Sequence, residues 1–131
     1  MTPRLAIAFF LLACAFAGAA SAANDHAHAG GDHQAQHAGV IAATPALDYE
    51  LVAQPALIRL YLRDHGKPTD VSTASARLTL LAGAEKQEVE LKPAGDRLEA
   101  AGRFKVGPGT KAVVVLTRAG KPASTARFTL N

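Results

Sequence analysis

Residues 76–91 read ARLTLLAGAEKQEVEL, and this stretch decides the fold class. Apolar side chains alternate with polar ones over residues 76–80 and again over residues 88–91, on either side of a break at Gly83. A period of two is the pattern of a β-strand with one face inward and one face toward water. Glycine at the break supplies the backbone freedom that a tight turn needs. The stretch therefore predicts two strands separated by a turn.

The same alternation recurs along most of the chain after Gly39. It is found in residues 47–53, 58–63, 76–80, 89–91, 98–106, 112–116 and 126–130. Glycine- and proline-containing turns separate these runs, at residues 65–68, 82–83, 93–96, 107–109 and 119–122. Seven short strands, or eight if Val40-Ile41-Ala42 pairs at an edge, predict an all-β domain over residues 40–131. The expected architecture is an immunoglobulin-like antiparallel β-sandwich.

Two local patterns refine this expectation. Residues 113–115 are all valine, so both faces of a strand there would be apolar, which indicates a strand in the middle of a sheet. Val71 to Ala76 is compatible with a single turn of helix.

The first 22 residues have the pattern of a secretory signal peptide. Arg4 precedes an apolar run over residues 5–17, and small residues follow. The run is shorter than the roughly 20 apolar residues of a membrane-spanning helix. Cleavage after Ala22, at an A-x-A site, predicts release of a soluble periplasmic protein. The alternative is a lipoprotein anchored through Cys14, which we favour less because apolar residues continue beyond the cysteine.

Composition excludes several classes of protein. The chain has 14 Lys and Arg against 11 Asp and Glu, a net charge of +3 that is too small to indicate nucleic-acid binding. The only Cys and the only Met lie within the first 22 residues, so the rest of the chain has no soft ligand for Cu(I). We also find no nucleophile motif, phosphate loop or dinucleotide fingerprint, and therefore expect no enzyme.

Residues 24–39, NDHAHAGGDHQAQHAG, hold four of the five histidines and no branched aliphatic or aromatic residue. This composition predicts a disordered tail, which we assign to residues 23–39. Imidazole is a preferred ligand of Zn²⁺, Cu²⁺, Ni²⁺ and Co²⁺, so the tail predicts an exchangeable divalent metal bound by His26, His28, His33 and His37. A solubilising linker without a metal is the alternative.

Two further features of the sequence bear on metal binding. Cleavage after Ala23 instead of Ala22 would place His26 third in the mature chain, where an amino-terminal Cu²⁺ or Ni²⁺ site can form. His65 is the one histidine of the domain, and it lies in the sequence Asp64-His65-Gly66 between two strands. Its position favours a turn residue, while a further metal ligand or a contact to the tail is the other interpretation.

Three stretches carry a resemblance to a known family. They are DYELVAQPALIRLYLRDHGKP at 48–68, ARLTLLAGAEKQEVELKPAGDRLEAAGRFKVGPGTKAVVV at 76–115 and GKPASTARFTL at 120–130. With the histidine-rich segment before them, they resemble small periplasmic proteins that accompany heavy-metal efflux systems of the resistance-nodulation-division type in proteobacteria. The chain is also similar to segments near the front of the adaptor subunits of such pumps.

The resemblance covers about His33 to Leu130, and the matching histidines are His33, His37 and His65. Where the family has His-Gly-Gly-Val, this chain has His37 followed by Ala38, Gly39 and Val40. The resemblance implies a periplasmic metal-binding or metal-resistance accessory role, with a pump component as the expected partner. The alternative hypothesis is a periplasmic protein–protein interaction module with no metal role, since small sandwiches expose loops and edge strands.

Overall fold

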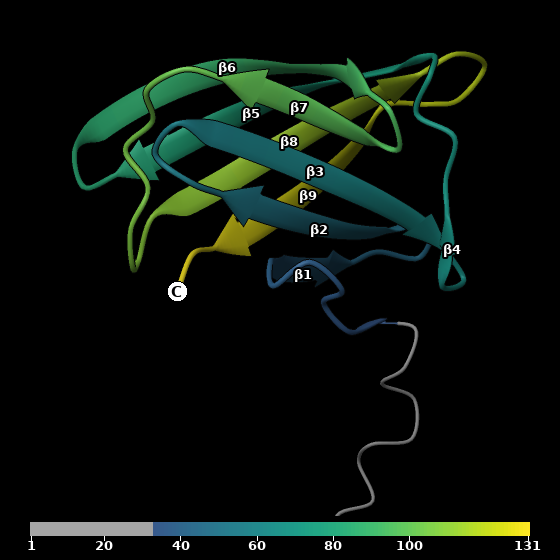
Figure 1. Ribbon diagram of the computed structural model, residues 1–131, viewed down its shortest axis with the longest axis horizontal. Coiled ribbons are helices and arrows are strands. Elements are labelled where there is room, and N and C mark those ends of the chain that lie inside the picture. Colours follow the sequence, from purple (N-terminus) through teal and green to yellow (C-terminus); the bar gives the residue numbers. More distant parts are fainter. Residues whose placement is uncertain (1–32) are drawn as a thin grey trace, which may run out of the picture.

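A computed structural model describes residues 33–131. The expected signal peptide, Cys14, His26 and His28 lie outside the described residues. Among those described, no helix is long and apolar enough to span a membrane. The strands are β1 (Val40–Ala43), β2 (Asp48–Ala53), β3 (Leu57–Asp64), β4 (Lys67–Pro68), β5 (Ala74–Ala82), β6 (Glu85–Ala94), β7 (Arg97–Ala101), β8 (Lys111–Arg118) and β9 (Ser124–Thr129) (Figure 1).

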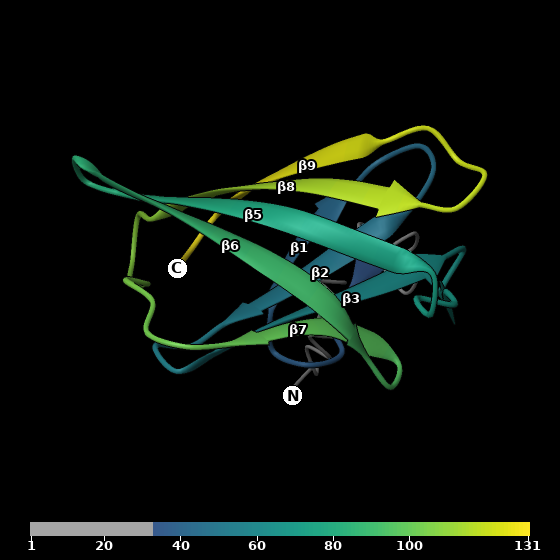
Figure 2. The same ribbon diagram turned by 90° about the horizontal axis from the view of Figure 1, so that it is seen from above.

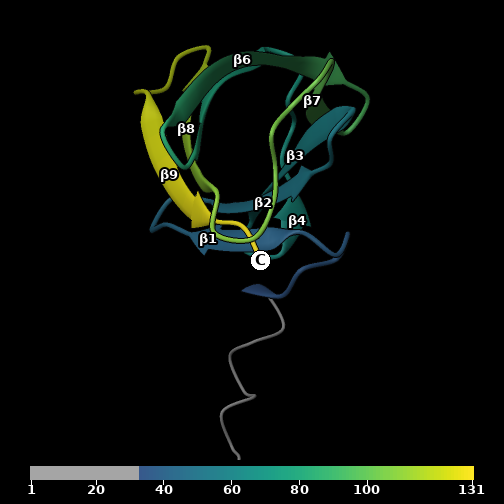
Figure 3. The same ribbon diagram turned by 90° about the vertical axis from the view of Figure 1, so that its left-hand side faces the viewer.

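All strand pairs are antiparallel, and the order across the sheet is β1-β2-β3-β7-β6-β5-β8-β9, with β4 paired to β3. The long strand β6 joins two layers, because its first part pairs with β5 and its last three residues pair with β7 (Figure 2). Seen along the strands, the sheet curls until β1 lies beside β9, nearly closing a barrel (Figure 3). The prediction of an all-β antiparallel sandwich is confirmed.

The core follows the period of two. On β5 the side chains of Ala74, Ala76, Leu78 and Leu80 are buried, whereas Ser75 and Arg77 between them and Leu81 after them are exposed. Facing strands add apolar side chains to the same cluster, including Leu60, Leu91, Leu98, Val114 and Leu116. Burial of aliphatic side chains on the inner face is therefore the main stabilising term of the fold.

Turn chemistry sets the strand register. The β5–β6 hairpin closes between Ala82 and Glu85 with Gly83 at a φ of 62°. A positive φ at the first loop position alone is typical of a type II′ turn, whose twist matches that of the flanking strands. The two strands and the turn predicted within residues 76–91 are thus confirmed, and the structure shows that the strands pair with each other as a hairpin.

The other expectations about strands have mixed outcomes. Val40–Ala43 does pair at an edge, as β1, and β8, which contains Val113 to Val115, does lie between β5 and β9. The helical turn at Val71 to Ala76 is wrong: the N–H of Ala74 donates to the carbonyl of Val71 in a turn, and β5 begins at Ala74. The apolar alternation that starts at Ala74 decides the conformation there. The run at 98–106 is a strand only to Ala101, after which Gly102 and Phe104 bond to the loop between β2 and β3.

Candidate functional site

The outer face of β2 carries two carboxylates that are buried. Leu47, Tyr49 and Leu51 point into the core, so Asp48 and Glu50, which alternate with them, point outward. Even so, Asp48 is 4% exposed and Glu50 is 0% exposed. A buried carboxylate needs hydrogen-bond partners to offset its lost hydration.

Residues 33–39 supply those partners to Glu50. Its Oε2 accepts the backbone N–H of His37 at 2.7 Å and of Gly39 at 3.0 Å. Its Oε1 accepts the N–H of Gln36 at 3.0 Å and Nδ1 of the His37 ring at 3.1 Å. Glu50 is therefore the anchor that holds the segment against β2.

These contacts set the protonation of Glu50. Burial by itself would raise the pKa of its carboxyl group. The N–H groups of Gln36, Gly39 and His37, together with the His37 ring, outweigh that effect and lower the pKa below its ordinary value. Glu50 is thus ionised at neutral pH and acts as a hydrogen-bond acceptor.

Two side chains of β3 complete the contact. The Arg63 guanidinium, which is buried, donates through Nη2 to the carbonyl of Gln34 at 2.6 Å and lies 3.8 Å from Oε1 of Glu50. Tyr61 is the register partner of Glu50, and its ring stacks on that of His37 with centroids 3.6 Å apart and planes 3° from parallel. The segment is therefore held by charge, hydrogen bonds and ring stacking together.

We expected residues 23–39 to be a disordered tail, and for residues 33–39 the structure differs. The expectation rested on a lack of apolar side chains, but these residues are fixed by polar contacts to Glu50, Asp48 and Arg63. Residues 23–32 lie outside the described part of the chain. One feature of the sequence indirectly indicates that residues 33–39 cover β2. Two acidic residues, Asp48 and Glu50, lie on the outer face of a strand that follows a histidine-rich segment.

The backbone of this segment is specialised at Ala38 and Gly39. Ala38 has a φ of 59°, in the left-handed region that favours glycine. At Gly39, a Cβ atom would lie 2.6 Å from the carbonyl oxygen of Leu51 and 2.8 Å from Cγ of Glu50, so only glycine fits.

The three described histidines share one arrangement. Nδ1 of His33 lies 2.7 Å from Oδ2 of Asp48, and Nδ1 of His65 lies 2.5 Å from Oδ1 of Asp64. His37 uses Nδ1 toward Glu50 in the same way. An ionised carboxylate only accepts hydrogen bonds, so we assign the proton of each neutral ring to Nδ1 and the lone pair to Nε2. Their side chains are 54%, 90% and 37% exposed for His33, His65 and His37.

The structure brings some of these histidines together and separates others. His33 and His65 line one small pocket of about 100 Å³ with Asp48 and Asp64. His37 instead lines a pocket of about 450 Å³ between the start of β1, the end of β2 and the last residues of the chain. Within residues 33–131, no three His, Cys, Asp or Glu side chains form a ready ligand set.

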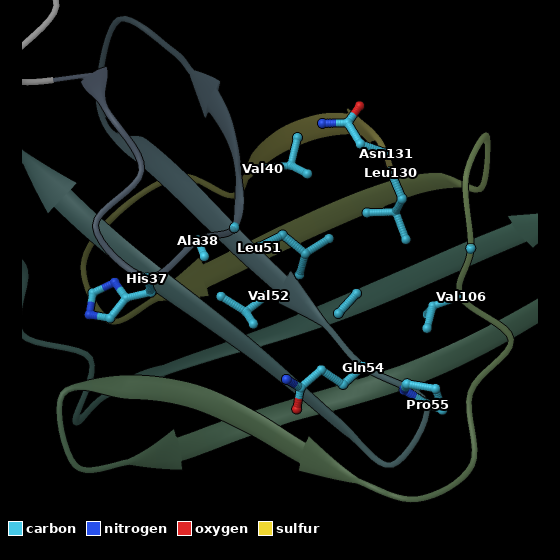
Figure 4. A pocket seen from close by; sticks show the side chains of 13 residues that line it. His37, Ala38, Val40, Leu51, Val52, Gln54, Pro55, Val106, Leu130 and Asn131 are labelled. Carbon is cyan, nitrogen blue, oxygen red and sulfur yellow. The ribbon is translucent and has the colours of Figure 1, made fainter.

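The pocket of about 450 Å³ has few polar or ionisable side chains in its lining. Figure 4 shows His37 at one end of it and Val106 and Pro55 at the other. Most of the side chains between them are apolar, and His37 is the one ionisable side chain in the lining. We therefore place the candidate site at the carboxylate-bound histidines.

No protein-family model matches the chain, and no curated protein has a similar sequence. Among solved structures, the chain is similar to a carbohydrate-binding module described as a bromine derivative of BhCBM56. The TM-score is 0.42 at 9% identity, over 70% of this chain and 99% of that one.

The backbone at Ala38 yields a first prediction. Ala38→Gly removes the cost of a left-handed φ at a residue with a side chain, and we expect it to raise the free energy of unfolding by about 1 kcal/mol. Gly39→Ala, one residue on, should lower it by more than about 1 kcal/mol because the added Cβ has no room. Chemical denaturation measures both, with Gly107→Ala as control, since a Cβ there meets nothing within 4 Å. Equal effects at positions 38 and 39 would contradict this account.

The pKa of Glu50 yields a second prediction. Because this pKa is lower in the folded than in the unfolded chain, its stabilising contribution is complete above about pH 4.5, the ordinary value, and is lost as pH falls through the folded pKa. Glu50→Gln should cost about 1–3 kcal/mol at pH 7, since buried N–H groups lose a charged acceptor. The difference between wild type and variant should shrink below pH 4.5. Denaturation at a series of pH values tests this, and a difference that persists undiminished at pH 3 would contradict it.

Proposed function

We propose that this chain is an exported periplasmic protein that binds a divalent transition-metal ion through its histidines, as an accessory of heavy-metal resistance or efflux. The observation that carries the proposal is the shared arrangement of the described histidines. Each has Nδ1 bonded to a carboxylate, which leaves Nε2 as the free ligand atom. Histidines that bind a metal almost always donate their other ring N–H to a carboxylate, a backbone carbonyl or a water, and such a partner orients the ring and raises its basicity.

The position of His33 supports a role for the histidines before it. Asp48 fixes His33 through a hydrogen bond to Nδ1 of its ring. His28 precedes His33 by five residues and His26 by seven. Five residues span at most about 17 Å and seven at most about 24 Å, so the chain tethers both imidazoles within these distances of His33.

The donor chemistry favours borderline divalent ions. Imidazole nitrogen suits Zn²⁺, Cu²⁺, Ni²⁺ and Co²⁺, and residues 33–131 contain no thiolate or thioether for Cu(I). Exposed imidazole rings suit an ion that exchanges, as a carrier or buffer requires. Export by the expected signal peptide would place this activity in the periplasm, where a pump component is the expected partner.

Calorimetric titration of the protein purified from the periplasm tests the proposal. We expect the wild-type protein to bind Zn²⁺ or Cu²⁺ and to show no binding of Mg²⁺, which prefers oxygen ligands. Replacing His26, His28 and His33 together by asparagine should weaken binding at least about tenfold, because each removes an imidazole. These substitutions leave in place the amides of residues 36–39 that Glu50 binds.

Gln34→Asn is the matched control, since it changes the same segment, removes no imidazole and keeps the carbonyl that Arg63 uses. If wild type binds none of Zn²⁺, Cu²⁺, Ni²⁺ and Co²⁺, the proposal is wrong, and the interaction-module hypothesis takes its place.

A further inference from the structure

A small pocket lies at the end of the sheet where β2 begins and β3 ends. One wall is the loop of residues 44–47 between β1 and β2, and the other is the end of β3 with its turn into β4. Its lining includes two imidazoles, His33 and His65, and two carboxylates, Asp48 and Asp64, with no Lys or Arg. Two separate parts of the chain thus deliver nitrogen donors to one place.

Each imidazole in this pocket is oriented by a carboxylate of its own. Asp48 is hydrogen-bonded to Nδ1 of His33, and Asp64 is hydrogen-bonded to Nδ1 of His65. The carboxylates add negative charge beside the pocket while both Nε2 atoms keep their lone pairs. A cation bound between the rings would therefore be favoured by charge as well as by the nitrogen ligands.

The turn that carries His65 holds the histidine at a positive φ. It joins Asp64 to Lys67 through two residues, His65 and Gly66, whose φ angles are 51° and 79°. Positive φ at both positions defines a type I′ turn, in which Asn-Gly is the favoured sequence. Histidine at the first position costs backbone energy, and such costs are found preferentially at functional sites.

His37 does not belong to this group. Its ring is stacked on Tyr61 and bonded to Glu50, and it lines the other, larger pocket. We regard His37 as a positioning residue that fixes the segment, so that His33 reaches Asp48.

We propose that His33 and His65 are the two fixed ligands of one divalent metal site, with Nε2 of each ring bound to the ion. This inference rests on the proposed function and deepens it by naming the ligands that the folded domain supplies. Cu²⁺ should bind most tightly, as the stability order of divalent ions requires for nitrogen donors. The remaining coordination positions stay open to water.

The test is Cu²⁺ and Zn²⁺ titration of wild type, His65→Asn, His33→Asn and the double variant. Asparagine is the preferred residue in a type I′ turn, so His65→Asn should keep or raise the thermal midpoint while it removes a ligand. We expect each single variant to lower Cu²⁺ affinity at least about tenfold. The double variant should lose little more than either single one, because one missing ligand already breaks a shared site.

Asp64→Asn, which leaves His65 in place but removes its orienting charge, should weaken binding less than His65→Asn does. With Zn²⁺, nitrogen NMR should show shifts at Nε2 of His33 and His65 and none at His37. If wild type binds Cu²⁺ and His65→Asn binds it equally well, this inference is overturned while the proposed function stands. If wild type binds neither ion, both fall.

Discussion

A single buried carboxylate, that of Glu50, holds the segment of residues 33–39 against strand β2. It points away from the core of the barrel and would face water if β2 were uncovered. Three backbone N–H groups and one imidazole enclose it instead. Because an ionised carboxylate without partners is costly to bury, the glutamate and the histidine-bearing segment require each other. Neither the strand nor the segment explains this geometry alone.

The positions of the histidines follow from that constraint. With residues 36–39 fixed on Glu50, His37 stacks on Tyr61 and the chain before it runs along β2 to Asp48. His33 is thereby set beside the β3–β4 turn, in the pocket that His65 also lines. Polar contacts that stabilise the segment thus also orient the imidazoles on which the proposed function depends.

The sequence predicts the strands well because their cause is local. Alternation over residues 76–80 and 88–91 and a glycine at position 83 specify two strands and a turn without knowledge of the rest of the chain. The roles of Asp48 and Glu50 could not be found in this way. A polar residue on the outer face of a strand gives the same apolar–polar alternation whether water or another segment of the chain covers it. Here the covering residues are 11–15 positions away in sequence. The low hydrophobicity of residues 23–39 predicts a mobile tail. Hydrophobicity takes no account of the hydrogen bonds that residues 36–39 donate to the buried carboxylate of Glu50.

Hydrogen exchange of the Gln36, His37 and Gly39 amides, followed by NMR, tests most directly whether Glu50 holds the histidine segment in place. The account predicts slow exchange at all three in wild type. In a Glu50→Gln variant their exchange should approach that of an unstructured chain, while the amide of Leu78 in the core strand β5 stays protected. Fast exchange of the three amides in wild type, or unchanged protection in the variant, would contradict it.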